Sequence, residues 1–95
     1  MARPARLDDT PIAQWLSNHP AWTRDGDALT RTYTLSDFAT AIGFVVRVGF
    51  LAEKMDHHPD IAIAYRKVTL RFSTHDAGGI TELDLAGANG ADGFA

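Results

Sequence analysis

The apolar run from Phe38 to Ala52 is the feature that most constrains how this 95-residue chain folds. Only Thr40 and Arg47 interrupt it, and the other side chains recur at helical spacing. One apolar stripe consists of Phe38, Ile42, Val45, Gly49 and Ala52, and a second of Phe44, Val48, Leu51 and Met55. We expect a long helix from Ser36 to Met55, with Ser36 as its N-cap and Asp37 in its first turn. Two apolar stripes need two partners, one the sheet and the other a second helix or a second subunit.

The same run does not predict a membrane span, because a spanning helix needs ~20 apolar residues and Arg47 would lie in lipid. The first residues contain no apolar segment of a signal peptide. A net charge of −3 without a basic patch argues against nucleic-acid binding. With no cysteine, disulfide scaffolds, thiolate catalysis, zinc ribbons and iron–sulfur clusters are excluded. We expect a cytoplasmic protein.

The rest of the pattern predicts an α+β fold in a single domain spanning residues 1–95. Thr10-Pro11 starts a short helix that ends before Pro20. We expect strands at Trp22–Arg24, Ala28–Thr34 and Ile61–Thr74, the first two joined by a tight turn at Asp25-Gly26-Asp27. A last helix opens at Thr81, and Gly87 and the later glycines break it. Residues 1–9 and 87–95 are expected to be loose tails. This order of elements favours an antiparallel sheet with helices packed on one face.

The candidate chemistry lies in three histidines, His57, His58 and His75, because histidine titrates near neutral pH without help from its surroundings. His57 and His58 end the long helix, and His75 follows the long strand, so all three rings could line one cleft. Two simpler interpretations remain open. The His-His pair could be a solvent-facing helix end. It could also join flanking aspartates in a metal site, namely Asp56, Asp60 and Asp76.

The spacing of these residues is similar to a family signature. From Glu53 to Asp84 the chain reads E-x3-H-H-P-x5-Y-x9-H-x8-D, in which Tyr65 is the Y and His75 is the isolated H. This pattern resembles that of the pterin-4a-carbinolamine dehydratases, and the likeness covers roughly residues 10–85. The resemblance implies a four-stranded antiparallel sheet with helices on one face. It also implies homodimers or homotetramers formed through the long helix and the sheet edge, with no metal and no organic cofactor.

The resemblance further implies a reaction. The family dehydrates 4a-hydroxytetrahydropterin to quinonoid dihydropterin and water, recycling the cofactor of aromatic amino-acid hydroxylases. By position, His58 is the principal acid/base, while His57 and His75 bind the pterin and assist. Glu53 lies one turn before His57 and is expected to orient that ring. The remaining substrate-binding candidates are Pro59, Thr74, Asp76 and Ala77, whose backbone would bind the edges of the pterin, and Trp22, which would stack on its face.

The chain departs from the family pattern at three points. Leu83 stands where an arginine is common, Ile61 where an aromatic residue is common, and glycines from Gly87 onward shorten the last helix. The alternative function is a non-enzymatic dimeric interaction module, either a transcription cofactor or an assembly chaperone. Because chaperone-like relatives tend to lose the histidine set and this chain keeps all three, the sequence favours the enzyme.

Overall fold

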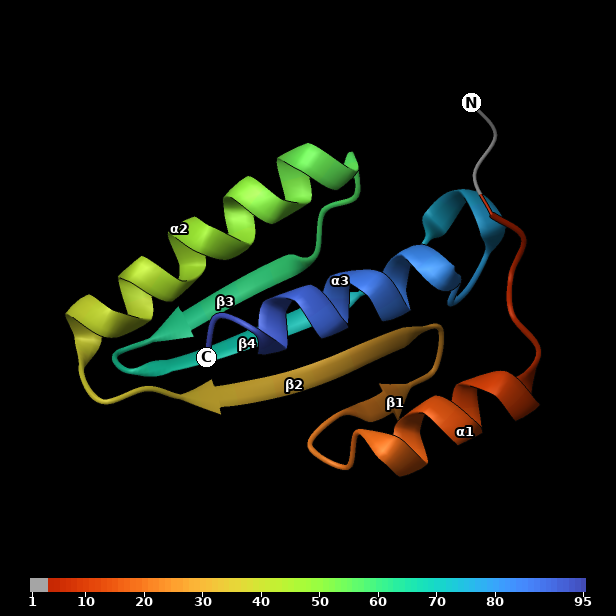
Figure 1. Ribbon diagram of the computed structural model, residues 1–95, viewed down its shortest axis with the longest axis horizontal. Helices are drawn as coiled ribbons and strands as arrows, with labels where there is room; N and C mark the ends of the chain where they lie inside the picture. Colours follow the sequence, from red (N-terminus) through yellow and green to blue (C-terminus); the bar gives the residue numbers. More distant parts are fainter. Residues whose placement is uncertain (1–3) are drawn as a thin grey trace.

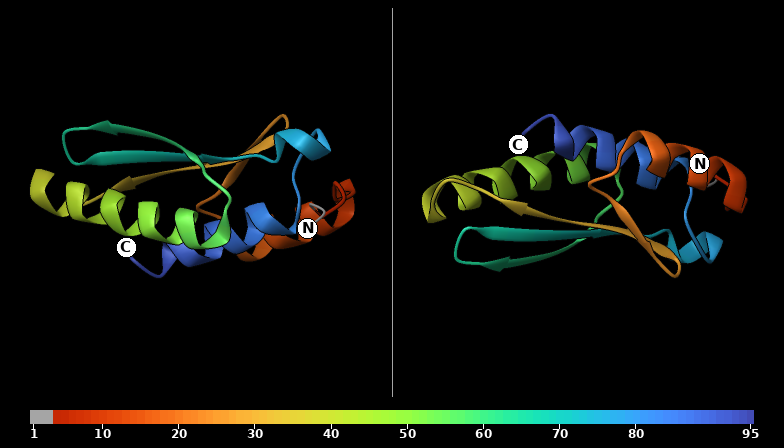
Figure 2. Two further views of the ribbon diagram at one scale, coloured as in Figure 1. Left: turned by 90° about the horizontal axis from the view of Figure 1, so that it is seen from above. Right: turned by 90° about the horizontal axis from the view of Figure 1, so that it is seen from below.

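The structure, a computed structural model, describes residues 4–95. Within them, three α-helices cover one face of an antiparallel sheet with the strand order β1-β2-β4-β3 (Figures 1 and 2). The strands are β1 (Thr23–Asp25), β2 (Ala28–Thr34), β3 (Asp60–Ala64) and β4 (Lys67–Phe72). The helices are α1 (Asp9–Asn18), α2 (Phe38–Met55) and α3 (Glu82–Asp92), with a short 3-10 helix η1 (His75–Ala77) before α3. The predicted α+β fold with a four-stranded antiparallel sheet is confirmed.

The period-two pattern of β4 separates the two faces of the sheet. Val68, Leu70 and Phe72 are buried beneath the helices, whereas the residues between them face the uncovered side. The register pairs Leu29 of β2 with Phe72, so apolar residues of neighbouring strands share the covered face. The core therefore fills the space between the sheet and the helices.

The hydrophobic pattern located α1 and α2, but both N-caps differ from the prediction. The cap of α1 is Asp8 rather than Thr10, and Pro11 still falls in the first turn, where its missing N–H costs nothing. The cap of α2 is Asp37 rather than Ser36: its carboxylate accepts a hydrogen bond from the Thr40 backbone N–H at 2.7 Å. That hydrogen bond lowers the pKa of the Asp37 carboxyl. A carboxylate in this position complements the positive end of the helix dipole.

The single strand predicted for Ile61–Thr74 is wrong, because the segment folds back on itself as β3 and β4. Ala64 pairs with Lys67, leaving a two-residue turn at Tyr65-Arg66. Tyr65 takes a left-handed conformation with φ of +55°. Such turns usually contain glycine or asparagine, and this one contains neither. The turn was therefore missed from the sequence.

The last helix does not end at Gly87 as predicted, but continues to Asp92. Two of the glycines there allow close packing. A Cβ on Gly87 would lie 2.5 Å from Cε1 of Phe72, and one on Gly90 would lie 2.6 Å from Cδ2 of Leu51. The stretch 87–95, expected to be a loose tail, is thus attached to the fold, since α3 packs against α2 and β4.

The ends of the chain are held by specific hydrogen bonds. The carboxylate of Asp92 accepts hydrogen bonds from Nε1 of Trp22, a guanidinium N–H of Arg31 and the hydroxyl of Tyr33. Near the other end, the Leu7 N–H donates to the Ile80 carbonyl at 2.8 Å. Residues 1–3 of the expected N-terminal tail lie outside the described residues.

One side of α2 is covered and another is not. Ala41, Phe44, Val48 and Ala52 are buried. Large apolar side chains at four-residue spacing are exposed on the same helix, namely Phe38, Ile42, Val46 and Phe50, the last to 73%. Part of the first predicted stripe therefore has no partner within residues 4–95. Within the same residues, no helix is long and apolar enough to cross a membrane.

Candidate active site

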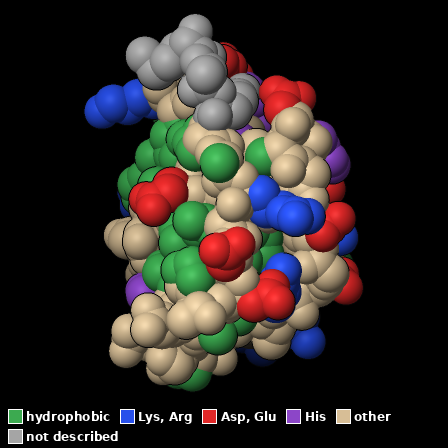
Figure 3. Space-filling view, turned by 90° about the vertical axis from the view of Figure 1, so that its right-hand side faces the viewer, with side chains coloured by type: hydrophobic (Ala, Val, Ile, Leu, Met, Phe, Trp, Pro, Cys, Tyr) green, Lys and Arg blue, Asp and Glu red, His purple; other side chains and the backbone are tan. Residues whose placement is uncertain are grey.

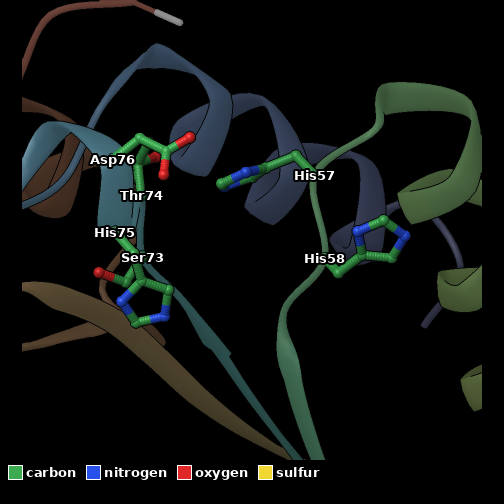
Figure 4. A pocket seen from close by; sticks show the side chains of 6 residues that line it. All are labelled: His57, His58, Ser73, Thr74, His75 and Asp76. Atoms are coloured by element: carbon green, nitrogen blue, oxygen red, sulfur yellow. The ribbon is translucent and has the colours of Figure 1, made fainter.

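Two chain segments meet at one end of the sheet and line a cavity of about 190 Å³. The loop after α2 contributes His57 and His58, and the segment from the end of β4 into η1 contributes Ser73, Thr74, His75 and Asp76 (Figure 4). Asp56 ends α2 in the left-handed region, with φ of +50°. This turn redirects the chain from the helix toward the end of β4. All three histidines are among the residues that line this cavity.

His57 is held by a buried carboxylate. Its Nε2 atom lies 2.6 Å from Oδ1 of Asp84, and the two side chains are only 6% and 0% exposed. The second carboxylate oxygen accepts hydrogen bonds from the Thr81 backbone N–H at 2.9 Å and from the Thr74 hydroxyl at 2.8 Å. Because a carboxylate accepts, Nε2 of His57 carries the proton, and neutral His57 has its lone pair on Nδ1.

The position of Asp84 follows from the start of α3. Thr81 is the N-cap, and Asp84, three residues later, completes a capping box by accepting from the Thr81 N–H. The N-terminal end of a helix stabilises negative charge, so a buried carboxylate is tolerated here. The same side chain therefore caps α3 and binds His57.

Glu53 does not contact His57 as predicted but pairs with His58. Oε1 of Glu53 lies 2.7 Å from Nε2 of His58, and the side chains are 79% and 54% exposed. The prediction assumed continuous helical spacing, which the left-handed turn at Asp56 ends. In Figure 4 the His58 ring points away from the space between His57 and His75, so it lies at the rim of the cavity.

The other predicted binding residues divide into three groups. Thr74 and Asp76 line the cavity with the histidines. Pro59 and Ala77 are next to lining residues in the chain but are not among them. The prediction that Trp22 stacks on the ligand is wrong, because this side chain is only 3% exposed. Aromatic rings pack around it in the core, including those of Tyr33 and Phe72.

Sequence reasoning missed the carboxylate that binds His57. Asp84 was noted only as a position in the signature, and Thr81 only as a helix start. The T-x-x-D spacing was a usable signal, because it predicts a capping box at the start of a helix. The sequence gives no sign that this box lies beside His57. Within residues 4–95, no group of three or more His, Asp or Glu side chains is arranged to hold a metal ion.

Comparison with known proteins identifies the family. The family profile described as pterin 4 alpha carbinolamine dehydratase matches residues 5–94. The chain belongs to the pterin-4-alpha-carbinolamine dehydratase family. A curated relative from Thermomicrobium roseum, named "Putative pterin-4-alpha-carbinolamine dehydratase", is 56% identical over 82 residues, which cover 86% of this chain and 88% of the relative. The resemblance noted in the sequence is confirmed.

Solved structures support the same family and fold. The crystal structure of a transcriptional coactivator/pterin dehydratase from Brucella melitensis matches with a TM-score of 0.90 and 35% identity, covering 95% of this chain and 98% of that one. A pterin dehydratase-like protein described as a RuBisCO assembly factor in the alpha-carboxysome matches with a TM-score of 0.68 and 22% identity. That match covers 79% of this chain and 89% of the other, and it shows the fold alone.

One face of this family member mixes both signs of charge. On the face seen in Figure 3, Lys and Arg side chains lie among Asp and Glu side chains and do not form a continuous basic area. This face lacks the clustered positive charge that phosphate-backbone binding requires.

Proposed function

We propose that this protein dehydrates 4a-hydroxytetrahydropterin to quinonoid dihydropterin and water, using histidine side chains as general acids and bases. The observation that carries the proposal is the cavity itself. It gathers three histidines from two distant chain segments, and two of them are paired with carboxylates. Family membership supplies the substrate class. The proposed role in the cell is to recycle the cofactor of aromatic amino-acid hydroxylases.

The reaction needs two proton transfers. The hydroxyl on C4a must gain a proton to leave as water, and N5 must lose its proton so that the C4a=N5 double bond can form. Both transfers suit groups that titrate near neutral pH, and a positioned acid or base typically contributes ~10²–10⁴-fold to the rate. The reaction is balanced, with one water released and no net gain or loss of electrons.

The environments of the histidines suggest different roles. His58 is exposed at the rim beside Glu53, so its ring can exchange a proton with solvent between turnovers and serve as the principal acid/base. His57 is buried and bound to Asp84, which suits a fixed group that binds the pterin through Nδ1. His75 stands on the opposite segment and would protonate the hydroxyl of the other C4a stereoisomer. Backbone groups beside Pro59, Thr74, Asp76 and Ala77 would bind the polar edges of the ring.

The proposal includes a homodimer or homotetramer formed through α2 and the sheet edge. The apolar stripe of α2 is exposed, and exposed apolar patches of this kind mark interaction sites. β3 is an edge strand, and Ile61 and Ile63 on it are 39% and 38% exposed. An open edge strand can pair with a second copy. The same surfaces would serve the alternative function, a non-enzymatic interaction module, which does not need the histidine cavity.

A stopped-flow assay with chemically generated 4a-hydroxytetrahydropterin tests the proposal. The spontaneous reaction gives the baseline for wild type and for His57→Ala, His58→Ala and His75→Ala. We expect wild type to accelerate dehydration and His58→Ala to lose ~10²–10⁴-fold of that acceleration, with smaller losses in the other two.

His19 provides the matched control, because it lies outside the cavity and stacks on Trp15 with ring centroids 4.0 Å apart. His19→Ala is expected to keep the wild-type rate. Absence of acceleration by wild type would contradict the dehydratase proposal and favour the interaction module. Acceleration that survives His58→Ala would transfer the principal role to another histidine.

A further inference from the structure

A second cavity adjoins the histidine cavity on the uncovered face of the sheet. It has a volume of about 430 Å³, and its lining includes Asp27, Asp60, Arg71, Ser73 and His75. Ser73 and His75 also line the histidine cavity. The two cavities therefore share a wall, and a molecule bound in the first lies next to the second.

The sheet register brings the charged groups of this second cavity together. Asp60 of β3 and Arg71 of β4 are direct partners across the two strands, so their side chains lie on the same face. The β1–β2 hairpin closes another side, because the Ser73 hydroxyl donates to the Asp27 carbonyl at 2.6 Å. This hydrogen bond fixes the hairpin against the end of β4.

The charges of the lining select a type of ligand. The lining contains two acidic residues, Asp27 and Asp60, and one arginine, Arg71, so it is net negative and disfavours an anion. Arg71 also lies 3.7 Å from Asp25, at the exposed surface, where such pairs are weak, and its five N–H groups exceed what one carboxylate can accept. A hydroxyl group both donates and accepts hydrogen bonds. A neutral polyol therefore matches carboxylates beside a guanidinium.

We infer that the second cavity binds the hydroxylated side chain on C6 of the pterin, with Asp60 and Arg71 as the residues that determine side-chain specificity. This inference rests on the proposed dehydratase function. In the substrate, C6 is bonded to N5, which is in turn bonded to C4a, where the hydroxyl leaves. A ring whose reacting atoms lie near His75 thus has its C6 substituent beside the wall that leads to the second cavity.

The test compares two substrates, one with a 1,2-dihydroxypropyl group on C6 and one with a methyl group there. We expect wild type to have the higher kcat/KM for the dihydroxypropyl substrate. Asp60→Asn and Arg71→Ala are expected to reduce that preference by about 3-fold to 10-fold, the effect of a lost hydrogen bond, without changing kcat/KM for the methyl substrate. Lys67→Ala is the matched control for Arg71, because Lys67 lies exposed at the far end of β4.

The outcomes separate this inference from the function on which it rests. Equal rates with the two substrates, or a preference that both variants retain, overturns the side-chain site but leaves the dehydratase. No acceleration of either substrate overturns both. As competitive inhibitors, a 6-hydroxymethyl pterin is expected to bind more tightly than its phosphate ester. The reverse order overturns the assignment of a neutral ligand.

Discussion

Nε2 of His57 donates a hydrogen bond to Oδ1 of Asp84 at 2.6 Å, and the pair is almost completely buried. The carboxylate is fixed in turn by the Thr81 N–H and the Thr74 hydroxyl. This network fixes the tautomer of His57 and the direction of its ring. It also links the start of α3 to the loop after α2, so the stability of the fold and the geometry of the site depend on the same side chain.

Asp84→Asn is expected to lower kcat/KM for dehydration by about 10-fold to 100-fold, a part of the ~10²–10⁴-fold contributed by a positioned acid–base group. An amide cannot accept on both sides as the carboxylate does. If the amide NH2 faces His57, the His57 proton must move from Nε2 to Nδ1. If the NH2 faces Thr81, it opposes the Thr81 backbone N–H, and two donors then face each other. We expect the pH profile of kcat to change as well. A fall in thermal stability without any change in rate or pH profile would assign Asp84 a structural role alone.

Glu53→Gln provides the exposed counterpart of that variant. Glu53 pairs with His58 at 2.7 Å, but the glutamate is 79% exposed, and pairs in solvent contribute at most about 1 kcal/mol. We expect kcat to fall by about 5-fold or less and the melting temperature to stay unchanged. Stopped-flow rates and thermal unfolding measure the two quantities. A loss as large as that of Asp84→Asn would mean that solvent does not screen the His58–Glu53 pair.

The sequence predicted those parts of the fold that depend on periodicity. Alternation in β4 and helical spacing in α2 reflect burial, which hydrophobic patterns report directly. The turn at Tyr65 left no such signal, because a bulky residue rarely takes a positive φ. At Gly87 the sequence carries a signal, but the signal predicts the wrong structure. The low helix propensity of glycine predicts a helix end there, whereas in the structure Gly87 lies inside α3 and packs closely against Phe72.

The site was predictable as a set of residue types but not as a set of partners. His57, His58 and His75 are candidates because histidine titrates near neutral pH, and their spacing also matches a family signature. Which carboxylate pairs with which histidine depends on the left-handed turn at Asp56 and on where the fold places the start of α3. The T-x-x-D spacing indicates that start in the sequence, but no local pattern places it beside His57.

Phe50→Glu is expected to dissociate the assembly proposed to form through α2. Phe50 is 73% exposed, so a charge there costs little in an isolated subunit but is buried in a helix-to-helix interface. Sedimentation velocity is expected to show that the Phe50→Glu protein is a smaller species than wild type. If the variant remains a dimer, its subunits are held together through the β3 edge instead. Ala86→Glu, on an exposed position of α3, is the control. A monomeric wild type would contradict the proposal.

Gly87→Ala and Gly43→Ala should change stability in opposite directions. A Cβ at Gly87 would meet Phe72 at 2.5 Å, whereas one at Gly43 meets nothing within 4 Å. We expect Gly87→Ala to lower the free energy of unfolding by about 1–3 kcal/mol through overpacking. Gly43→Ala should raise it by up to about 1 kcal/mol through helix propensity. Denaturant unfolding measures both, and a neutral Gly87→Ala would mean that α3 shifts away from β4 without cost.

Tyr33→Phe tests the hydrogen bond that anchors the end of α3. Burial, and then the hydrogen bond to Asp92, raise the pKa of Tyr33 above its ordinary value of 10.0. The folded protein therefore keeps this proton while the unfolded chain loses it, so stability falls as the pH rises above about 10. We expect Tyr33→Phe to lose about 1–2 kcal/mol at pH 7, and the difference from wild type to shrink above pH 10. Unfolding curves at several pH values measure this, with exposed Tyr65→Phe as the control. Parallel pH dependence in wild type and Tyr33→Phe would show that Tyr33 titrates alike in both states.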